Sequence, residues 1–324
     1  MTCIDLSVVI EWENVLISED ERCFAMLRQL RKQLSELNQS AEVIVLFNRD
    51  QLDRAEIELV LREHFGASDT GDLPELRLEE TWGTRYYELK NEGAARARGQ
   101  IVVFLDSDVV PEEGWARELT EPFFDRPDVD VVAGHTHVAH GNLHEKAFAL
   151  GWFFPLRISS KTVHSDGLRF FANNVAFRRD VILKYPFPKI PPGVTRGACG
   201  LLARQLTSSG ITIWTNTAAR ADHPPPTDLR HFIIRAMAHG RDIILSETAA
   251  GRAFHKALAA NVRWSIGRML LAGLRIPRGH RQVQLALWQA PFAIGLMACF
   301  YSLALVGGCV TLISPQFATR HWQI

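Results

Sequence analysis

The stretch IVVFLDSDVVP, residues 101–111, runs from five apolar residues into an Asp-Ser-Asp triplet and ends at a proline. An uninterrupted apolar run rich in β-branched and aromatic residues is typical of a strand that is buried on both faces. Asp106 and Asp108 stand directly behind this run, so we expect both at the end of the strand. Because one residue separates them, both carboxylates can reach a single divalent cation.

The residues before this strand alternate between apolar strands and amphipathic helices. Expected strands cover 6–12, 42–47 and 76–80, and expected helices cover 19–37, 52–65 and 87–98. This alternation predicts a mostly parallel α/β sheet with helices on both faces. Ligands of such sheets bind at the carboxyl ends of the strands. Glu11 to Asn14, Asn48 to Asp50 and Asp106 to Asp108 should therefore lie along one edge.

The second half of the chain is less regular. We expect a strand at 128–138, a strand followed by a helix start at 169–182, and a loop at 186–198. A helix at 199–210, a strand at 211–216 and a helix at 230–245 complete the sheet domain. His135 and His137 share one strand face, and this spacing suits a metal, although strand-end histidines without a metal are the favoured interpretation.

The composition excludes two functional classes. Lys plus Arg and Asp plus Glu both total 36, so the net charge of zero gives no overall attraction to nucleic acid. The five cysteines never form a Cys-x-x-Cys pair, which favours reduced thiols over a disulfide framework or a zinc site.

The C-terminal segment contains no charged residue and no histidine from Leu285 to Ile313. A helix needs ~20 apolar residues to cross a bilayer, so this run predicts a transmembrane helix, with a buried core helix as the alternative. Basic residues between Arg263 and Arg281 precede it, interleaved with apolar residues that could lie in the membrane interface. The positive-inside bias then places the preceding domain in the cytoplasm of a single-pass protein.

The predicted organisation is a sheet domain at 1–245, a basic amphipathic segment at 246–284, the membrane helix at 285–313 and a short tail at 314–324.

The paired aspartates suit phosphate chemistry. Carboxylate oxygens suit Mg²⁺ or Mn²⁺, and such an ion neutralises a diphosphate leaving group. A lone Asp-x-Asp is more often a capped turn. The apolar strand before it and the helix-starting Pro-Glu-Glu-Gly-Trp after it favour a functional site.

In their order and spacing, four segments resemble the signatures of family 2 glycosyltransferases of the GT-A fold: SVVIEWEN, EVIVLFNRD, KNEGAARARGQIVVFLDSDVVPEEGWARELTEPF and FFANNVAFRRDVI. The resemblance runs from about residue 6 to residue 240, and its most specific part is the Asp-x-Asp with the preceding Asn-x-Gly. It implies a GT-A Rossmann-like mixed, mostly parallel sheet, and an enzyme that uses a nucleotide-sugar donor.

The resemblance implies roles for individual residues. Asp106 and Asp108 would hold the metal and contact the donor, with His223 as a third metal ligand. The nucleotide pocket would be lined by Asn14, Asn91 and Gly93, and the acceptor side by Asn173 and Asn174.

The chain departs from the family pattern at three places. Glu11-Trp12-Glu13 replaces Pro-x-Tyr, and Phe47-Asn48 replaces paired aspartates that read the base, so Glu11, Asn48 or Asp50 are candidate substitutes. The Glu-Asp pair that normally supplies the general base is absent from residues 195–199. His164 and Asp166 are candidate bases. Arg196, which we expect on the acceptor side, could instead bind a phosphate of the acceptor or the donor.

These observations predict a membrane-anchored glycosyltransferase. It would move a sugar, with the inversion that the resemblance implies, from a nucleotide-diphosphate donor to a lipid-linked or glycan acceptor. The missing base motivates one alternative, a degenerate member that binds a nucleotide-sugar or a partner without turnover. A nucleotidyltransferase would need a Gly-rich basic loop where residues 11–21 are acidic, and a glycoside hydrolase would need carboxylates on opposite sides of a sugar.

Overall fold

The computed structural model describes residues 4–66 and 74–322, which form two compact units. The sheet unit comprises Met1–Thr136, Arg157–Lys189 and Gly197–His223. The helical unit comprises His137–Leu156, Ile190–Arg196 and Pro224–Ile324. The sheet unit therefore ends earlier along the chain than the boundary expected at residue 245.

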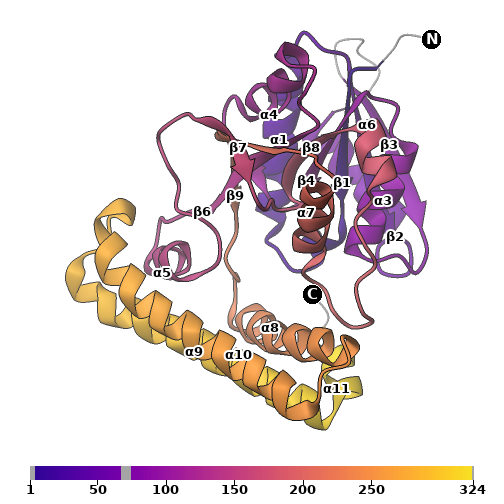
Figure 1. The fold of residues 1–324 in the computed structure, drawn as a ribbon. Helices are drawn as coiled ribbons and strands as arrows, with labels where there is room; N and C mark the ends of the chain where they lie inside the picture. Colours follow the sequence, from indigo (N-terminus) through magenta and orange to yellow (C-terminus); the bar gives the residue numbers. More distant parts are fainter. Residues whose placement is uncertain (1–3, 67–73, 323–324) are drawn as a thin grey trace. The chain divides into compact units, whose positions relative to one another are not determined.

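The strands of the described residues form one sheet in the order β3-β2-β1-β4-β8-β6-β9-β5, and β7 pairs with β9 (Figure 1). The strands are β1 Leu6–Glu11, β2 Ala41–Asn48, β3 Glu75–Thr81, β4 Ile101–Asp106, β5 Val110–Pro111, β6 Val131–Val138, β7 Val163–Gly167, β8 Asn174–Arg178 and β9 Ile213–His223. The sheet is mixed: β3, β2, β1 and β4 are parallel, and β8 begins an antiparallel half.

The parallel half follows the sequence pattern closely. Every residue of β1 and β4 is buried, as their continuous apolar runs require. Helices α1 Asp20–Ser35, α2 Arg54–His64 and α4 Trp115–Asp125 pack on one face, where Met26, Leu30 and Leu119 meet Val8 and Val103. Helix α3 Tyr86–Arg96 covers the other face. The carboxyl ends of β1, β2 and β4 consequently meet at one edge.

Helices also follow the antiparallel strands. Helix α6 Arg179–Lys184 continues directly from β8, and α7 Ala198–Ser208 precedes β9. The two-residue strand β5 pairs with the end of β9, with Val110 opposite Asp222. This pairing brings the segment after β4 to the end of β9.

The helical unit contains α5 Leu143–Gly151, α8 Leu229–Ala249, α9 Phe254–Gly279, the short turns η2 His280–Val283 and η3 Leu287–Gln289, α10 Ala290–Ile313 and α11 Pro315–His321. Asp228 caps α8, because its side chain accepts a hydrogen bond from the His231 amide at 2.7 Å. Helices α8, α9 and α10 pack along one another (Figure 1). This packing explains why α8 belongs to the helical unit although we expected it in the sheet domain.

One helical stretch of the described chain, Leu287–Ile313, is long and apolar enough to cross a membrane. The apolar core helix of a helical bundle can have the same length and the same composition.

Candidate functional site

The edge formed by the carboxyl ends of β1 and β4 gathers three of the predicted residues. Glu11 and Asp106 are direct neighbours in the strand register. Asn14 bridges them, because its Nδ2 donates hydrogen bonds to Glu11 Oε1 at 2.8 Å and to Asp106 Oδ2 at 3.2 Å. Glu11 and Asp106 are buried, so this cluster is an organised part of the fold.

Helix α3 adds two residues that the sequence analysis missed. Lys90 Nζ lies 2.7 Å from Asp106 Oδ1, and the Tyr86 hydroxyl lies 2.8 Å from both carboxylate oxygens. Tyr86 and Lys90 are four residues apart, so they occupy one face of the helix. A lysine in a helix is normally solvent-exposed, and only the Lys-Asn-x-Gly context could have indicated this one.

Two carboxyl groups at this edge, those of Glu11 and Glu13, have raised pKa values. Burial, reinforced by the neighbouring Asp106, raises the pKa of Glu11 well above its ordinary value. Burial, together with the nearby Glu88, raises the pKa of Glu13 to about 7. A protonated carboxyl group is a hydrogen-bond donor, so Glu13 can donate as well as accept a hydrogen bond near neutral pH.

A second cluster joins the segment that contains Asp108 to the end of β9. Arg22 Nη1 donates to Asp222 Oδ2 at 2.8 Å, and its Nε and Nη2 donate to the Asp108 carbonyl oxygen at 3.3 Å. His223 follows Asp222, and both Asp108 and His223 are buried. Because β5 and β9 are antiparallel neighbours, Asp108 and His223 come to the same end of the sheet.

One of the predicted metal ligands, Asp106, takes part in several hydrogen bonds. Both oxygens of Asp106 already accept hydrogen bonds, from Lys90, Tyr86 and Asn14. Within residues 4–66 and 74–322, no three His, Cys, Asp or Glu side chains are grouped to hold an ion. Carboxylate and imidazole groups are of the kind that bind Mg²⁺ or Mn²⁺, and Asp108 and His223 come to the same end of the sheet, so phosphate oxygens and water would have to complete the coordination of an ion there. The set of Asp106, Asp108 and His223 stays a prediction.

The loop after β2 makes contacts within the sheet unit. Asn48 Oδ1 accepts from the Asp50 amide at 3.1 Å, and Asn48 Nδ2 donates to the Thr84 carbonyl at 3.4 Å. Asp50 Oδ2 accepts from the Gly83 amide at 3.0 Å. Asn48 and Asp50 thus hold the β2 loop against the β3–α3 connection, and a contact with the nucleotide base stays a prediction.

The Asn-x-Gly element has packing contacts. Asn91 exchanges two hydrogen bonds of 2.9 Å with the backbone of Phe187. Gly93 lies against Val9 and Leu46, where a Cβ atom would overlap both side chains. Both residues thus position α3 on the sheet and so help to place Lys90, while direct nucleotide contacts of Asn91 and Gly93 stay predictions.

The two asparagines predicted on the acceptor side differ in their surroundings. Asn174 is fully buried, where its Oδ1 accepts from Trp115 Nε1 at 2.8 Å and its Nδ2 donates to the Ala219 carbonyl at 3.0 Å. Asn173 accepts a 3.1 Å hydrogen bond from Thr136. Leu105 is opposite Asn174 in the register, so Asn173 lies beside Asp106 at the edge.

The remaining candidates lie elsewhere. Arg196 belongs to the helical unit, where its Nη1 lies 3.4 Å from Asp242 Oδ2. His164 is exposed on β7, opposite Thr215 of β9. Asp166 is also on β7, and its side chain lies outside the described part of the chain. The role of either residue as a general base stays a prediction.

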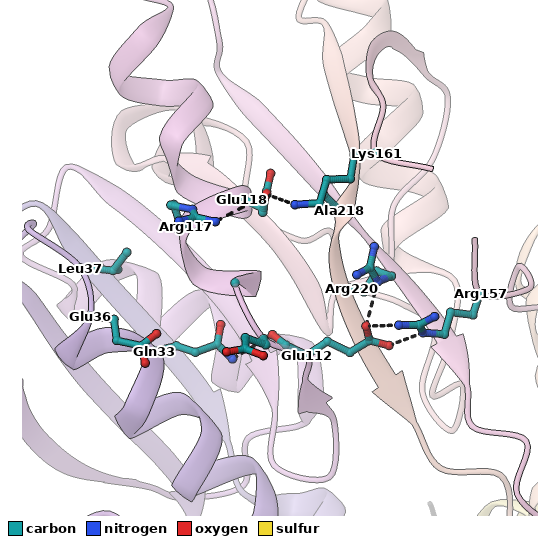
Figure 2. Close-up of a pocket in the computed structure, with 12 residues that line it drawn as sticks. Gln33, Glu36, Leu37, Glu112, Arg117, Glu118, Arg157, Lys161, Ala218 and Arg220 are labelled. Atoms are coloured by element: carbon teal, nitrogen blue, oxygen red, sulfur yellow. Dashed lines mark hydrogen bonds and ion pairs between the residues drawn. The ribbon is translucent and has the colours of Figure 1, made fainter. Parts of the chain in front are cut away.

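Figure 2 shows a cavity of about 590 Å³ in the sheet unit. Its lining comes from α1, α4, β9 and the segments after β5 and before β7. Glu112 accepts hydrogen bonds from Arg157 at 2.6 and 2.8 Å and from Arg220 at 2.8 Å, and Lys161 pairs with Glu118 at 3.0 Å. Of the described residues that line it, none belongs to the predicted site, and its main charges neutralise one another.

Comparisons with known proteins agree with this fold. Residues 77–185, which include α3 and the Asp106–Asp108 segment, match the family model described as glycosyl transferase family 2. The mannosyltransferase PcManGT from Pyrobaculum calidifontis, solved with GDP-Man and Mn²⁺, is 14% identical with a TM-score of 0.54, over 96% of this chain and 87% of that chain. S. aureus TarS 1–349, solved with UDP-GlcNAc, is 12% identical with a TM-score of 0.51, over 97% of this chain and 93% of that chain. A comparison with curated proteins gave no match.

Proposed function

We propose that this chain, whose residues 77–185 match the glycosyl transferase family 2 model, transfers a sugar from a nucleoside-diphosphate donor to an acceptor at the cytoplasmic face of a membrane. The observation that carries this proposal is the cluster of Glu11, Asn14 and Asp106, next to Asp108, at the carboxyl edge of the sheet. Nucleotide ligands of parallel sheets bind at that edge.

The residues at this edge would contact different parts of the donor. Asp106 is held in place by Lys90 and Tyr86 and would face the nucleotide part of the donor. Asp108 and His223 would hold a Mg²⁺ or Mn²⁺ ion, which when bound neutralises the leaving diphosphate. Arg22 fixes the segment that contains Asp108 against the end of β9.

The transfer itself is a displacement at the anomeric carbon. An acceptor oxygen forms a bond to that carbon from the face opposite the diphosphate, while the bond from carbon to the diphosphate oxygen breaks. The configuration inverts, the nucleoside diphosphate departs, and the proton of the acceptor hydroxyl passes to a base. Residues 195–199 lack the acidic pair, and β7 pairs His164 with Thr215, eight residues before His223 along β9, so this strand lies away from the edge that holds Asp108 and the base stays unassigned.

Positive charge in the helical unit supports an acceptor with a phosphate group. His231, Arg235 and His239 recur every four residues on α8, which places them on one face of that helix. Burial, together with Arg196 and Arg235, lowers the pKa of His239 well below its ordinary value. The two histidines are therefore uncharged near neutral pH, and the arginine of this face is the group that would attract a phosphate. A lipid-linked glycan precursor has such a group, and the basic, apolar C-terminal region suits a location beside lipid.

The test is transfer or donor hydrolysis across a panel of nucleotide-sugars, with Mn²⁺, with Mg²⁺ and with a chelator. Asp108→Asn should lower turnover by about 100-fold or more. The matched control Asp125→Asn, at an exposed position on α4, should keep full activity. Full activity of Asp108→Asn would refute the assignment. Calorimetric binding of a nucleoside diphosphate with no turnover across the panel would instead favour the degenerate, binding-only member.

A further inference from the structure

The C-terminal quarter of the chain is strongly basic. Residues 248–324 contain seven arginines and one lysine but no aspartate or glutamate, although the whole chain has a net charge of zero. Such a segment attracts anionic surfaces within the Debye length. Phospholipid headgroups are one such surface, and each Lys or Arg that approaches them adds to the affinity.

Helix α9 presents an apolar face outward. Ile266, Leu270 and Leu274 are 45%, 65% and 53% exposed and recur every four residues along the helix. Arg263 and Arg278 are exposed at the two ends of this row. An apolar row bordered by arginines is typical of a helix that lies in the plane of a membrane interface.

The connection between α9 and α10 exposes large side chains. Leu287, Trp288 and Phe292 are 61%, 71% and 63% exposed, and the rings of Trp288 and Phe292 meet edge to face at 6.4 Å. Arg281, which is also exposed, precedes them. Tryptophan and arginine together favour the headgroup region of a bilayer, where an aromatic ring meets apolar chains and water.

Helix α10 is part of a packed bundle. A Cβ atom on Gly240 of α8 would overlap the backbone of Ala304 and Gly308, so the two helices touch through their backbones. Asn261 of α9 donates to the Leu305 carbonyl at 3.1 Å. On the opposite side from Ala304, α10 exposes Phe292 and Val306.

This packing conflicts with a simple transmembrane span. Helices α8 and α9 lie along α10, so a span by α10 would draw both into the hydrocarbon region. Arg241 and Asp242 of α8 and Arg268 of α9 would then lie at membrane depth, where ionised side chains are costly.

We propose that the helical unit docks on the surface of an anionic phospholipid bilayer, with α9 and α10 parallel to the membrane plane. The docking surface consists of the outward faces of α9 and α10 and the connection between them. The whole chain then stays on one side of the membrane. This inference concerns how the chain is attached, and it does not depend on which reaction the sheet unit catalyses.

Vesicle flotation with the full chain tests the docking surface. Binding to vesicles that contain phosphatidylglycerol should exceed binding to phosphatidylcholine vesicles by at least about tenfold and should fall with added salt. Arg278→Glu with Arg281→Glu, and separately Trp288→Ser with Phe292→Ser, should each lower binding by about tenfold or more. Leu59→Ser and Arg62→Glu, at exposed positions on α2, are the matched controls and should bind normally. Equal binding by all variants, or self-association in place of vesicle binding, would overturn the proposal.

Labelling with a membrane-impermeant maleimide tests the orientation of α10. Gln316→Cys lies beyond α10, and Glu63→Cys lies on α2 of the sheet unit; both positions are exposed. In a chain whose native cysteines are replaced by alanine, both should react from the same side of sealed vesicles. A protease that removes an epitope tag after residue 324 repeats the measurement without cysteine replacement. Access to the two positions from opposite sides would establish a span and overturn the proposal, whether or not the protein transfers a sugar.

Discussion

Lys90 Nζ lies 2.7 Å from Oδ1 of Asp106, and the two side chains are 0% and 5% exposed. A buried carboxylate needs a charged or hydrogen-bonding partner, because the interior does not replace the hydration that it loses. Helix α3 therefore supplies the positive charge that allows β4 to end in an aspartate. The strand and the helix form one electrostatic unit at the carboxyl edge of the sheet.

Lys90→Met should destabilise the protein by about 3 kcal/mol, because it leaves the charge of Asp106 buried without its partner. The double variant Lys90→Met with Asp106→Asn should recover most of that loss, since it removes both charges together. Urea unfolding of the two variants, with Asp106→Asn to complete the cycle, measures the difference. Equal destabilisation of Lys90→Met and the double variant would show that the pair is not coupled.

Arg22→Met should reduce turnover more than it reduces stability. The arginine joins the Asp108 carbonyl to Asp222, so its loss frees the segment that carries a proposed diphosphate-side residue. We expect kcat/KM to fall about tenfold or more and the free energy of unfolding to fall by about 1–2 kcal/mol. Arg28→Met, which removes an exposed ion pair with Glu21, is the matched control and should change neither. An unchanged kcat/KM in Arg22→Met would show that Arg22 does not support the activity of the site.

Alanine substitution should mainly lower stability at Asn174 and mainly lower transfer activity at Asn173. Asn174→Ala leaves Trp115 Nε1 and the Ala219 carbonyl without a partner in the core, which should cost about 2–3 kcal/mol of stability. Asn173→Ala removes one hydrogen bond from Thr136 and should cost about 1 kcal/mol, but it should lower transfer more, because this position lies beside Asp106. Thermal unfolding and transfer assays on both variants give the comparison. A larger loss of activity per unit of stability at Asn174 would contradict it.

The parallel half of the sheet was predictable because strands buried on both faces consist of consecutive apolar residues, a pattern that is visible in the sequence. This pattern predicts β1, β2 and β4, and the rule that ligands bind at the carboxyl ends of parallel strands then predicts that Glu11, Asn14 and Asp106 lie together. The antiparallel half depends on pairings between distant segments. The two residues of β5, which bring Asp108 to the end of β9, carry no periodic pattern of their own.

The contribution of α3 was not predictable for a different physical reason. The sequence predicts a helix there, but it does not say which face of that helix turns toward the strand ends. Tyr86 and Lys90 are identified only by their distance to Asp106. The same limit applies to α10, because an apolar run of 29 residues suits a bilayer and a helical bundle equally well, and the run does not predict its contacts with α8 and α9.

Glu13 should make stability depend on pH near neutrality. Burial, together with Glu88, raises its pKa from 4.5 to about 7 in the folded protein. Between these two values the folded state keeps a proton that the unfolded state has lost, so stability falls as the pH rises through this window. Glu13→Gln removes the ionisation, and at pH 8 it should therefore stabilise the protein by up to about 2 kcal/mol, with little effect at pH 4.5. Glu88→Gln should reproduce a smaller part of the gain, because Glu88 is the second cause of the raised pKa. Urea unfolding at the two pH values measures both variants, and a gain of equal size at pH 4.5 and pH 8 would show that the titration of Glu13 is not the cause.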